Sequence, residues 1–364
     1  MRILHVINNL DSAGAERLVV DFAKAQCDAG HEASVLELSG RRTPLCEELE
    51  SAGVALHTLG LGVYNPLCIL RARRYLRDAD VVHVHLFPSQ YWVAAARMLT
   101  RTKAVFVTTE HNTDNVRCHY WLTTQTDRWM YRCYDAATCI SPAVEEFMRE
   151  RTRGRLPLTL IENGISLQRF RTARAEGVRE ALGLSADVFL LIQVARFRRQ
   201  KNQDCVLRAL THLPDDVHAL FVGDGPRLDE CRELAERLGV SERAHFLGAR
   251  TDVPALIQAS DLVVMSSHWE GFGLAAVEGM AAGKPALASR VEGLSQVVGN
   301  EDLLFNPDDD LQLSKKVVSL RADSETYARA AEYCRARAGL YDIANTSRRL
   351  IKFYEDTINR TQKR

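Results

Sequence analysis

A glycine-rich turn carries the strongest chemical signal in the sequence. The segment His268–Glu278, HWEGFGLAAVE, directly follows the apolar run Leu262–Met265 and opens an expected helix that runs to about Ala282. Its small residues Gly271 and Gly273 let a ligand approach the backbone. The N–H groups at the start of the helix form an anion site suited to a diphosphate. They belong to Phe272, Gly273, Leu274 and Ala275.

Two carboxylates flank this anion site. Glu270 precedes the expected start of the helix and Glu278 lies inside it, so neither is placed to repel a phosphate directly. Carboxylates accept hydrogen bonds from pairs of hydroxyl groups, which suggests a sugar on one side and a ribose on the other. A lone pair of glycines in such a turn more often reflects tight packing. The acid–Gly–aromatic–Gly context with a second acid favours a binding site.

A second candidate site follows another apolar run, Phe189–Val194. In the next segment, ARFRRQKN, Arg196 and Lys201 are fixed cations after an expected strand, where they can neutralise a leaving diphosphate. Alone, they would describe a solvated basic loop. Their position at the start of the second half of the chain favours the functional interpretation.

The elements that position these residues follow a regular rhythm. Short apolar runs rich in β-formers alternate with amphipathic stretches, a pattern typical of parallel strands joined by crossover helices. In the first half we expect strands at Ile3–Ile7, His31–Leu38, Val81–Leu86 and Ala104–Thr109, and a helix at Glu16–Ala29. The rhythm restarts after the turn-forming pair Asn163-Gly164. The second set of strands is expected at Phe189–Val194, Ala219–Val222, His245–Leu247, Leu262–Met265 and Pro285–Ala288.

This rhythm predicts an α/β fold of two doubly wound Rossmann-like domains that face each other across a cleft. Ligands of such sheets bind outside the carboxyl ends of the strands. We expect an N-terminal domain at residues 1–164 and a C-terminal domain at 165–345. The stretch Thr326–Asn359 is expected to be long and helical and to pack on more than one surface, with a C-terminal helix at residues 346–364 packing back on the N-terminal domain.

Composition limits the partners. The 364 residues include 47 Lys and Arg and 47 Asp and Glu, so the formal net charge is zero. A nucleic-acid binder normally needs surplus positive charge, and we therefore expect no nucleic-acid partner. No run of about 18 apolar residues occurs, which predicts no membrane-spanning segment. Nine scattered cysteines without C-x-x-C spacing favour a reducing cytoplasm.

Taken together, these residues resemble the retaining family-four glycosyltransferases of the two-domain GT-B type. The mark of that family is a Glu, seven intervening residues and a second Glu, which Glu270 and Glu278 match. The resemblance covers almost the whole chain. Its further segments are NLDSAGAE at 9–16, ENGI at 162–165, VGDGP at 222–226 and FLG at 246–248.

The resemblance implies a role for each site residue. Glu270 is expected to contact the hydroxyls of the donor sugar, and Glu278 to hold the ribose. Arg196 and Lys201 are expected to stabilise the leaving nucleotide diphosphate. The backbone around the base is expected to come from Gly223, Gly225 and the segment between Leu247 and Val253.

The opening loop at Gly14 is expected near the phosphates. The family often has two adjacent glycines there, and Ala13 replaces the first. A methyl group is tolerated only if residue 13 keeps a negative φ.

Three histidines need separate interpretation. His111 follows the strand Ala104–Thr109, where similar enzymes place a cleft histidine beside the transferred sugar. A neutral imidazole exchanges hydrogen bonds with a sugar hydroxyl or stabilises positive charge developing at the anomeric carbon. His83 and His85 alternate on one strand and share a face. A core position and an acceptor contact both stay open for this pair.

The resemblance also implies front-face attack that retains the anomeric configuration, with the leaving phosphate accepting the proton of the acceptor. No protein nucleophile is then needed, and we expect neither a metal nor a cofactor. Asp78-Ala79-Asp80 superficially matches the Asp-x-Asp metal motif of the other glycosyltransferase fold, but it precedes a strand and is interpreted as a solvated turn. Asp308-Asp309-Asp310 is interpreted as an exposed loop and helix cap.

The acceptor is expected on the first domain, between Asn8 and Tyr134. The stretch Asn112–Trp129 supplies aromatic and cationic side chains suited to sugars and phosphates, although a plain amphipathic helix explains them too. A group of basic residues is either a patch for anionic lipid headgroups or a solvated helix face. It comprises Arg71, Arg73, Arg74, Arg77, Arg97, Arg101 and Lys103.

We therefore expect a cytoplasmic hexosyl-type transferase, with the inner face of the membrane as a second location. It would move a sugar from a nucleotide diphosphate donor, UDP-sugar favoured, to a glycan or lipid-linked acceptor in cell-surface polysaccharide biosynthesis. The alternatives are a non-hydrolysing nucleotide-sugar epimerase and a catalytically silent nucleotide-sugar-binding subunit. The paired glutamates disfavour the first, and the full set of site residues disfavours the second. The oligomeric state stays open.

Overall fold

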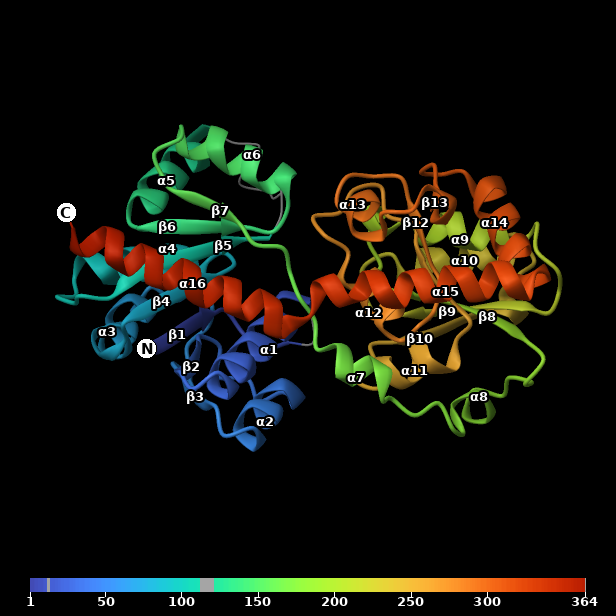
Figure 1. The fold of residues 1–364 in the computed structure, drawn as a ribbon, viewed down its shortest axis with the longest axis horizontal. Coiled ribbons are helices and arrows are strands. Elements are labelled where there is room, and N and C mark those ends of the chain that lie inside the picture. Colours follow the sequence, from blue (N-terminus) through green and yellow to red (C-terminus); the bar gives the residue numbers. More distant parts are fainter. Residues whose placement is uncertain (12–13, 112–120, 364) are drawn as a thin grey trace. The chain divides into compact units, whose positions relative to one another are not determined.

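The computed structural model describes residues 1–11, 14–111 and 121–363, and for residues 121–123 the backbone alone. The chain divides into two units (Figure 1). The first comprises residues 1–164 and 343–364, and the second comprises residues 165–342. Each unit is a parallel sheet covered by helices, so the predicted α/β fold with two doubly wound domains is confirmed.

The first unit contains a seven-stranded sheet in the order β3-β2-β1-β4-β5-β6-β7. Its strands are β1 (Arg2–Ile7), β2 (Glu32–Glu37), β3 (Ala55–Thr58), β4 (Val81–His85), β5 (Val105–Glu110), β6 (Ala136–Cys139) and β7 (Leu158–Leu160). Its helices are α1 (Gly14–Asp28), α2 (Pro44–Ser51), α3 (Leu67–Asp78), α4 (Ser89–Met98), α5 (Trp121–Arg132), α6 (Pro142–Thr152) and α16 (Ile343–Gln362).

The second unit contains a six-stranded sheet in the order β10-β9-β8-β11-β12-β13. Its strands are β8 (Phe189–Val194), β9 (Val217–Val222), β10 (Ala244–Gly248), β11 (Leu262–Met265), β12 (Ala286–Ser289) and β13 (Leu304–Phe305). Its helices are α7 (Leu167–Arg171), α8 (Val178–Ala181), α9 (Gln203–Leu210), α10 (Leu228–Arg237), α11 (Val253–Ala259), α12 (Leu274–Ala281), α13 (Leu294–Val298), α14 (Asp310–Ala322) and α15 (Ser324–Ala338).

Strand order places a switch point in each sheet. In the first, the chain leaves the β1 side and resumes with β4 on the other side of β1, and in the second β8 and β11 are related in the same way. The two crossover helices that follow such neighbouring strands lie on opposite faces, which opens a crevice at the carboxyl ends of the strands. All five residues of β4 are buried, as expected for a strand covered on both faces.

The chain end packs on the first unit. Leu350, Phe353 and Tyr354 of α16 join Ile3 and Phe22 in one hydrophobic cluster between the sheet and α1. Figure 1 shows α16 lying along this unit, while α15 belongs to the second unit and packs on α12. The last two helices of the chain therefore pack on different units, α15 on the second and α16 on the first.

The stretch Thr326–Asn359, expected to be helical, contains two helices. Helix α15 ends at Ala338, a 3-10 turn covers Gly339–Tyr341, and Asp342 is extended before α16 begins. The carbonyl of Tyr341 accepts a hydrogen bond from Ile165 N–H at 2.9 Å, and Ile165 forms a parallel bridge with Asp342. This pairing takes the backbone out of helical geometry. The chain passes between units after Asp342, three residues before the boundary expected at 345.

The two acidic runs lie where the sequence places them. Asp78 ends α3, and the Asp80 carboxylate accepts a hydrogen bond from Arg2 N–H at 2.8 Å, at the amino-terminal edge of the sheet. Asp309 caps α14 by accepting a hydrogen bond from Gln312 N–H at 2.8 Å. Among the described residues, no helix combines the length and the apolar character needed to cross a bilayer.

Candidate active site

An ion pair lies at the switch point of the second unit. The sequence analysis names both of its residues but does not predict that they contact each other. Lys201 follows β8 and Glu270 follows β11, and the Lys201 ammonium contacts Glu270 Oε2. Ser267 donates a hydrogen bond to the same oxygen at 3.2 Å. The two charged side chains are 19% and 14% exposed. A partly buried pair of this kind keeps both charges next to the crevice.

A buried polar network fixes the backbone that carries Lys201. The Gln193 amide donates to the carbonyl of Lys201 at 2.8 Å and to the Ser266 hydroxyl at 3.0 Å. That hydroxyl is itself 2.7 Å from the carbonyl of Asn202, to which it donates. Because both side chains are fully or nearly fully buried, these hydrogen bonds hold the loop after β8 against the end of β11.

His268 and Asp308 form a hydrogen-bonded clamp between loops, which the sequence analysis did not predict. His268 Nδ1 lies 2.9 Å from the carbonyl of Arg199, and its Nε2 lies 2.9 Å from Asp308 Oδ1. Asn202 also donates to Asp308 Oδ1, at 3.0 Å. The hydrogen bond from His268 is the main cause that lowers the pKa of Asp308. The clamp ties the loop after β8 to the loops after β11 and β13.

The start of α12 has the geometry expected of the glycine-rich turn. Gly273 has φ +95° and precedes Leu274, the first residue of the helix. A Cβ there would overlap the side chain of Leu294. Glu278 lies inside α12 and is half-buried. The predicted turn–helix geometry is present, while phosphate and ribose contacts stay predictions.

Gly223 and Gly225 hold two loops together. Gly223 has φ +140° and Gly225 has φ +155°. A Cβ on Gly223 would overlap the carbonyl oxygen of Ala195, and one on Gly225 would lie 2.5 Å from that of Phe197. Phe197 N–H also donates to the carbonyl of Asp224 at 3.0 Å. The glycines therefore shape the loop after β8, in addition to any contact with a base.

The remaining donor-site residues of this unit lie around the same edge. Arg196 is exposed, and its guanidinium has no ion-pair partner among the residues that the structure describes. Leu247 lies in β10 and Val253 begins α11, and both are half-buried. Phe272 is buried with its ring edge-on to Tyr341, at 5.3 Å between centroids, while Ala275 is half-buried in α12.

An open groove of about 880 Å³ lies next to this edge, but its charges are largely compensated. Arg227 pairs with Asp204 and Glu230, and Arg208 lies 3.8 Å from Asp308. Its lining does not include Lys201 or Glu270. We therefore place the candidate donor site at the Lys201–Glu270 pair and not in this groove.

In the first unit, His111 lies directly after β5 and is 8% exposed. Burial lowers its pKa to about 4, so the imidazole is neutral at physiological pH. Gly14 is exposed and begins α1, after β1. Ala13 and the stretch 112–120 of the expected acceptor region lie outside the described residues, so the prediction of a negative φ at residue 13 stays open.

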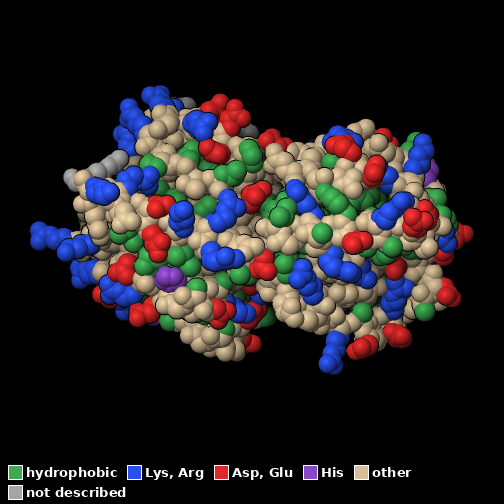
Figure 2. Space-filling view, in the orientation of Figure 1, with side chains coloured by type: hydrophobic (Ala, Val, Ile, Leu, Met, Phe, Trp, Pro, Cys, Tyr) green, Lys and Arg blue, Asp and Glu red, His purple; other side chains and the backbone are tan. Residues whose placement is uncertain are grey.

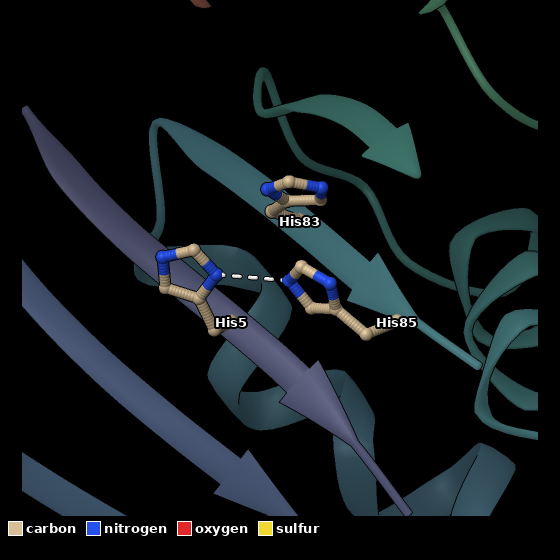
Figure 3. Close-up of side chains that lie close together, drawn as sticks. All are labelled: His5, His83 and His85. Carbon is tan, nitrogen blue, oxygen red and sulfur yellow. Dashed lines mark hydrogen bonds between the residues drawn. The ribbon is translucent and has the colours of Figure 1, made fainter. Parts of the chain in front are cut away.

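His83 and His85 are fully buried, as in the core interpretation. With His5 they form a cluster whose ligand atoms all lie within 4.8 Å of one another (Figure 3). Imidazoles are good zinc and copper ligands. Both His83 nitrogens, however, already meet hydroxyls, that of Tyr354 at 2.6 Å and that of Thr109 at 2.7 Å. The donor set therefore fits a hydrogen-bond network better than a metal.

Two family models match the chain. Residues 12–169 match the model described as Glycosyltransferase Family 4, and residues 176–337 match the model described as Glycosyl transferases group 1. The two matches follow one another and together span most of the chain.

Curated relatives include a named glycosyltransferase and a synthase. The lipopolysaccharide core biosynthesis glycosyltransferase LpsD of Rhizobium meliloti (strain 1021) is 27% identical over 335 residues, which covers 89% of each chain. The N-acetyl-alpha-D-glucosaminyl L-malate synthase of Bacillus anthracis is 27% identical over 284 residues, 76% of this chain and 74% of the relative.

Solved structures share the fold. Alr3699/HepE of Anabaena in complex with UDP and glucose superposes with a TM-score of 0.85 at 22% identity, covering 98% of this chain and 99% of that one. The sucrose-phosphate synthase of Thermosynechococcus elongatus superposes with a TM-score of 0.80 at 20% identity, covering 98% of each. With the matched models and the two doubly wound units, the chain belongs to the family-four glycosyltransferases of the GT-B fold.

Proposed function

We propose that this glycosyltransferase moves a sugar from a UDP-sugar to a glycan or lipid-linked acceptor in cell-surface polysaccharide biosynthesis, with retention of configuration and without a metal. The observation that carries the proposal is the Lys201–Glu270 pair at the β8–β11 switch point, in which Lys201 lies in the loop after β8 and Glu270 in the turn that leads into α12. A relative named for lipopolysaccharide core biosynthesis and a fold neighbour solved with UDP and glucose support the choice of donor and pathway.

The charges of the second unit suit a diphosphate leaving group. Lys201 and the exposed Arg196 offer two cations on one loop, and cations placed where negative charge develops lower the barrier of group transfer. Glu270 remains close to Lys201 and accepts hydrogen bonds from sugar hydroxyls, while Glu278 does the same for the ribose. Gly273 lets the diphosphate approach the start of α12.

The first unit supplies a neutral group. We propose that His111 contacts the transferred sugar as an uncharged imidazole, because burial lowers its pKa to about 4. A neutral ring can exchange hydrogen bonds with a hydroxyl without attracting the negatively charged diphosphate. The leaving phosphate then takes the proton of the acceptor, so no protein base is required.

A transfer assay with product analysis tests this proposal. Purified protein is incubated with UDP-, GDP- and ADP-sugars, with lipid-linked and free glycan acceptors, in the presence of EDTA. The proposal predicts a product from a UDP-sugar whose new linkage has the same anomeric configuration as the donor. An inverted linkage, or a strict requirement for a divalent metal, contradicts it. Epimerised donor formed without acceptor would identify the epimerase alternative, and binding without any turnover the silent subunit.

A surface of the first unit favours a lipid-linked acceptor at a membrane. Four apolar side chains of α3 and the end of α4 are at least half exposed: Leu67, Leu70, Met98 and Leu99. The two helices pack on one another, and Arg71, Arg74 and Arg77 of α3 are exposed. Figure 2 shows Lys and Arg side chains gathered along this end of the unit. Apolar groups beside cations suit an anionic lipid surface.

Vesicle sedimentation tests the membrane proposal. We expect the protein to sediment with vesicles containing anionic phosphatidylglycerol and not with pure phosphatidylcholine, and to be released by salt. Replacing Arg74 and Arg77 with Ser is expected to weaken binding severalfold, whereas the same change at Arg232 and Arg237 of α10 is expected to have no effect. Equal loss in both pairs contradicts a specific face.

We place the enzyme in the cytoplasm, where the eight described cysteines, all free thiols, suit a reducing milieu.

A further inference from the structure

Two buried glutamines flank the loop that carries Arg196 and Lys201. Gln193 belongs to β8 and Gln203 begins α9, and their side chains are 3% and 1% exposed. Each glutamine donates its side-chain amide to the backbone carbonyl of one of the two cations. Gln193 bonds to the carbonyl of Lys201 at 2.8 Å, and Gln203 bonds to that of Arg196 at 3.1 Å.

The carbonyl partners fix which end of each amide faces the loop. A backbone carbonyl only accepts hydrogen bonds, so the amide nitrogen and not Oε1 must face it. The Oε1 atoms of Gln193 and Gln203 are then left buried, and neither has a hydrogen-bond partner within the described residues. An unsatisfied buried oxygen reduces stability, and its presence in a folded protein needs a reason. Holding the loop is a reason that the two glutamines share.

The bond from Gln203 completes the support of a single peptide group. The group that joins Arg196 to Phe197 accepts at its carbonyl from Gln203, and its N–H donates to the carbonyl of Asp224 at 3.0 Å. Because a peptide group is planar, two hydrogen bonds at its opposite ends fix its plane. Phe197 is fully buried, whereas the Arg196 side chain is exposed. The fixed plane therefore holds the Cα of Arg196 and limits where the guanidinium can reach.

The supports of the two cations differ in redundancy. The carbonyl of Lys201 lies 3.1 Å from the Ser266 hydroxyl in addition to its bond with Gln193. For the carbonyl of Arg196, Gln203 is the single hydrogen-bond donor found among the described residues. Loss of the Gln203 amide should therefore loosen Arg196 more than Lys201.

We propose that Gln203 is a positioning residue for Arg196, the counterpart of Gln193 for Lys201. This inference rests on the proposed function, because it treats Arg196 as a cation that faces the diphosphate. A long exposed side chain on an unsupported backbone has to be ordered when a ligand binds, which lowers affinity. The amide of Gln203 orders the backbone of Arg196 before the ligand arrives.

Amide hydrogen exchange followed by NMR tests this support without a ligand. Gln203→Met keeps the length of the side chain but lacks the N–H. It replaces one unsatisfied oxygen, Oε1, by another, the carbonyl of Arg196, so we expect a Tm within about 2 °C of the wild type. The Phe197 N–H, on the same peptide group, is expected to exchange about tenfold faster. The Lys201 N–H, which donates to the carbonyl of Arg198 at 2.9 Å, is the internal reference. Unchanged exchange at Phe197, or equal acceleration at both amides, overturns the proposal.

Calorimetry with UDP shows whether the support acts through Arg196. We expect Arg196→Ala to weaken UDP binding about tenfold and Gln203→Met about fourfold. The double variant is expected to bind no more weakly than Arg196→Ala, because Gln203 then has no cation left to position. A further loss of about fourfold in the double variant overturns the proposal, since the amide would then act on the site by another route.

Gln258→Met is the matched control. The amide of Gln258, in α11, donates to the carbonyl of Phe170 at 2.7 Å, so this variant also removes a bond from a glutamine to the backbone. We expect it to bind UDP as the wild type does, and a loss equal to that of Gln203→Met contradicts a specific role. Gln203→Asn, whose amide is one methylene shorter, is measured beside Gln203→Met and should behave in the same way. If Arg196→Ala binds UDP as the wild type does, the proposed function of Arg196 fails, and the exchange rates alone decide whether Gln203 holds its peptide group.

Discussion

The two sheets of this enzyme end in chemically opposite edges. In the first unit, buried and neutral imidazoles lie in β1 and β4 and directly after β5. In the second, a partly exposed ion pair follows β8 and β11, beside Arg196, which has no ion-pair partner among the described residues. Both edges come from the same doubly wound topology. The difference shows that the topology provides only the place, and that the residues at and just after the strand ends decide whether an edge suits hydroxyls or a diphosphate.

Acidification is expected to break the neutral edge, with the largest effect. Burial lowers the folded pKa of His5 and His111 to about 4, below the unfolded value of 6.5. The unfolded chain therefore binds protons first, and stability is lost as pH falls below about 6.5 towards 4. At pH 5 each of these two groups costs about 2 kcal/mol.

Hydrogen exchange at pH 5 and pH 8, corrected for intrinsic rates, should show lost protection in β1 and β4 before β8 and β11. Equal loss in both sheets would contradict the contrast.

Removing the cation is expected to break the charged edge. Lys201→Ala takes away one charge that faces the leaving diphosphate and leaves Glu270 without its ion-pair partner. We expect turnover to fall by about 10²–10³, the usual cost of losing one transition-state contact. Steady-state transfer rates measure the effect. Arg199→Ala, the same change of charge on the same loop, is the control and should lose less than threefold. Similar losses in the two variants would refute the role of Lys201.

Crowding the loops is expected to deform the charged edge without changing its charge. Gly223→Ala places a Cβ against the carbonyl of Ala195. In Gly239→Ala the new Cβ meets open space, although φ is positive at this residue too. We expect Gly223→Ala to destabilise the protein by roughly 2–3 kcal/mol and to weaken UDP binding, and Gly239→Ala to cost about 1 kcal/mol with UDP binding intact. Urea denaturation and calorimetry give both numbers. A Gly223 variant as stable as the Gly239 variant would remove the proposed loop contact.

Loosening the clamp is expected to have the smallest effect. Asp308→Ala removes the carboxylate that holds His268 and Asn202, so the loop that carries Lys201 loses one of its anchors. We expect the UDP dissociation constant to rise about fivefold, equivalent to about 1 kcal/mol. Asp310→Ala is the control, because it removes an acid of α14 that does not contact His268. Unchanged affinity in Asp308→Ala would show that the Gln193–Ser266 network suffices.

The sequence predicted the parts of the fold and site that depend on local order. An apolar run followed by a basic segment located β8, an apolar run followed by a Gly-rich turn located β11, and the spacing of Glu270 and Glu278 placed one before α12 and the other inside it. Each of these patterns spans only a short segment of the chain. A single sequence carries such patterns directly.

Other features depend on contacts between distant residues. Gln26 and His5 are separated by 21 positions, and His268 and Asp308 by 40, so no local pattern links them. The break between α15 and α16 arises from the pairing of Ile165 with Asp342 while helical periodicity continues on both sides. The strands β3, β6 and β13 were not among the expected strands, because they lack the continuous run of large aliphatic residues that located β11.

Calorimetry with UDP tests the division between the two edges most directly. Metal-free titrations compare the wild type with Lys201→Met in the second unit and His111→Asn in the first. We predict that the wild type and His111→Asn bind UDP with affinities within twofold, and that Lys201→Met binds at least tenfold more weakly. Equal weakening in both variants, or wild-type binding that appears only when a divalent metal is added, would contradict the account.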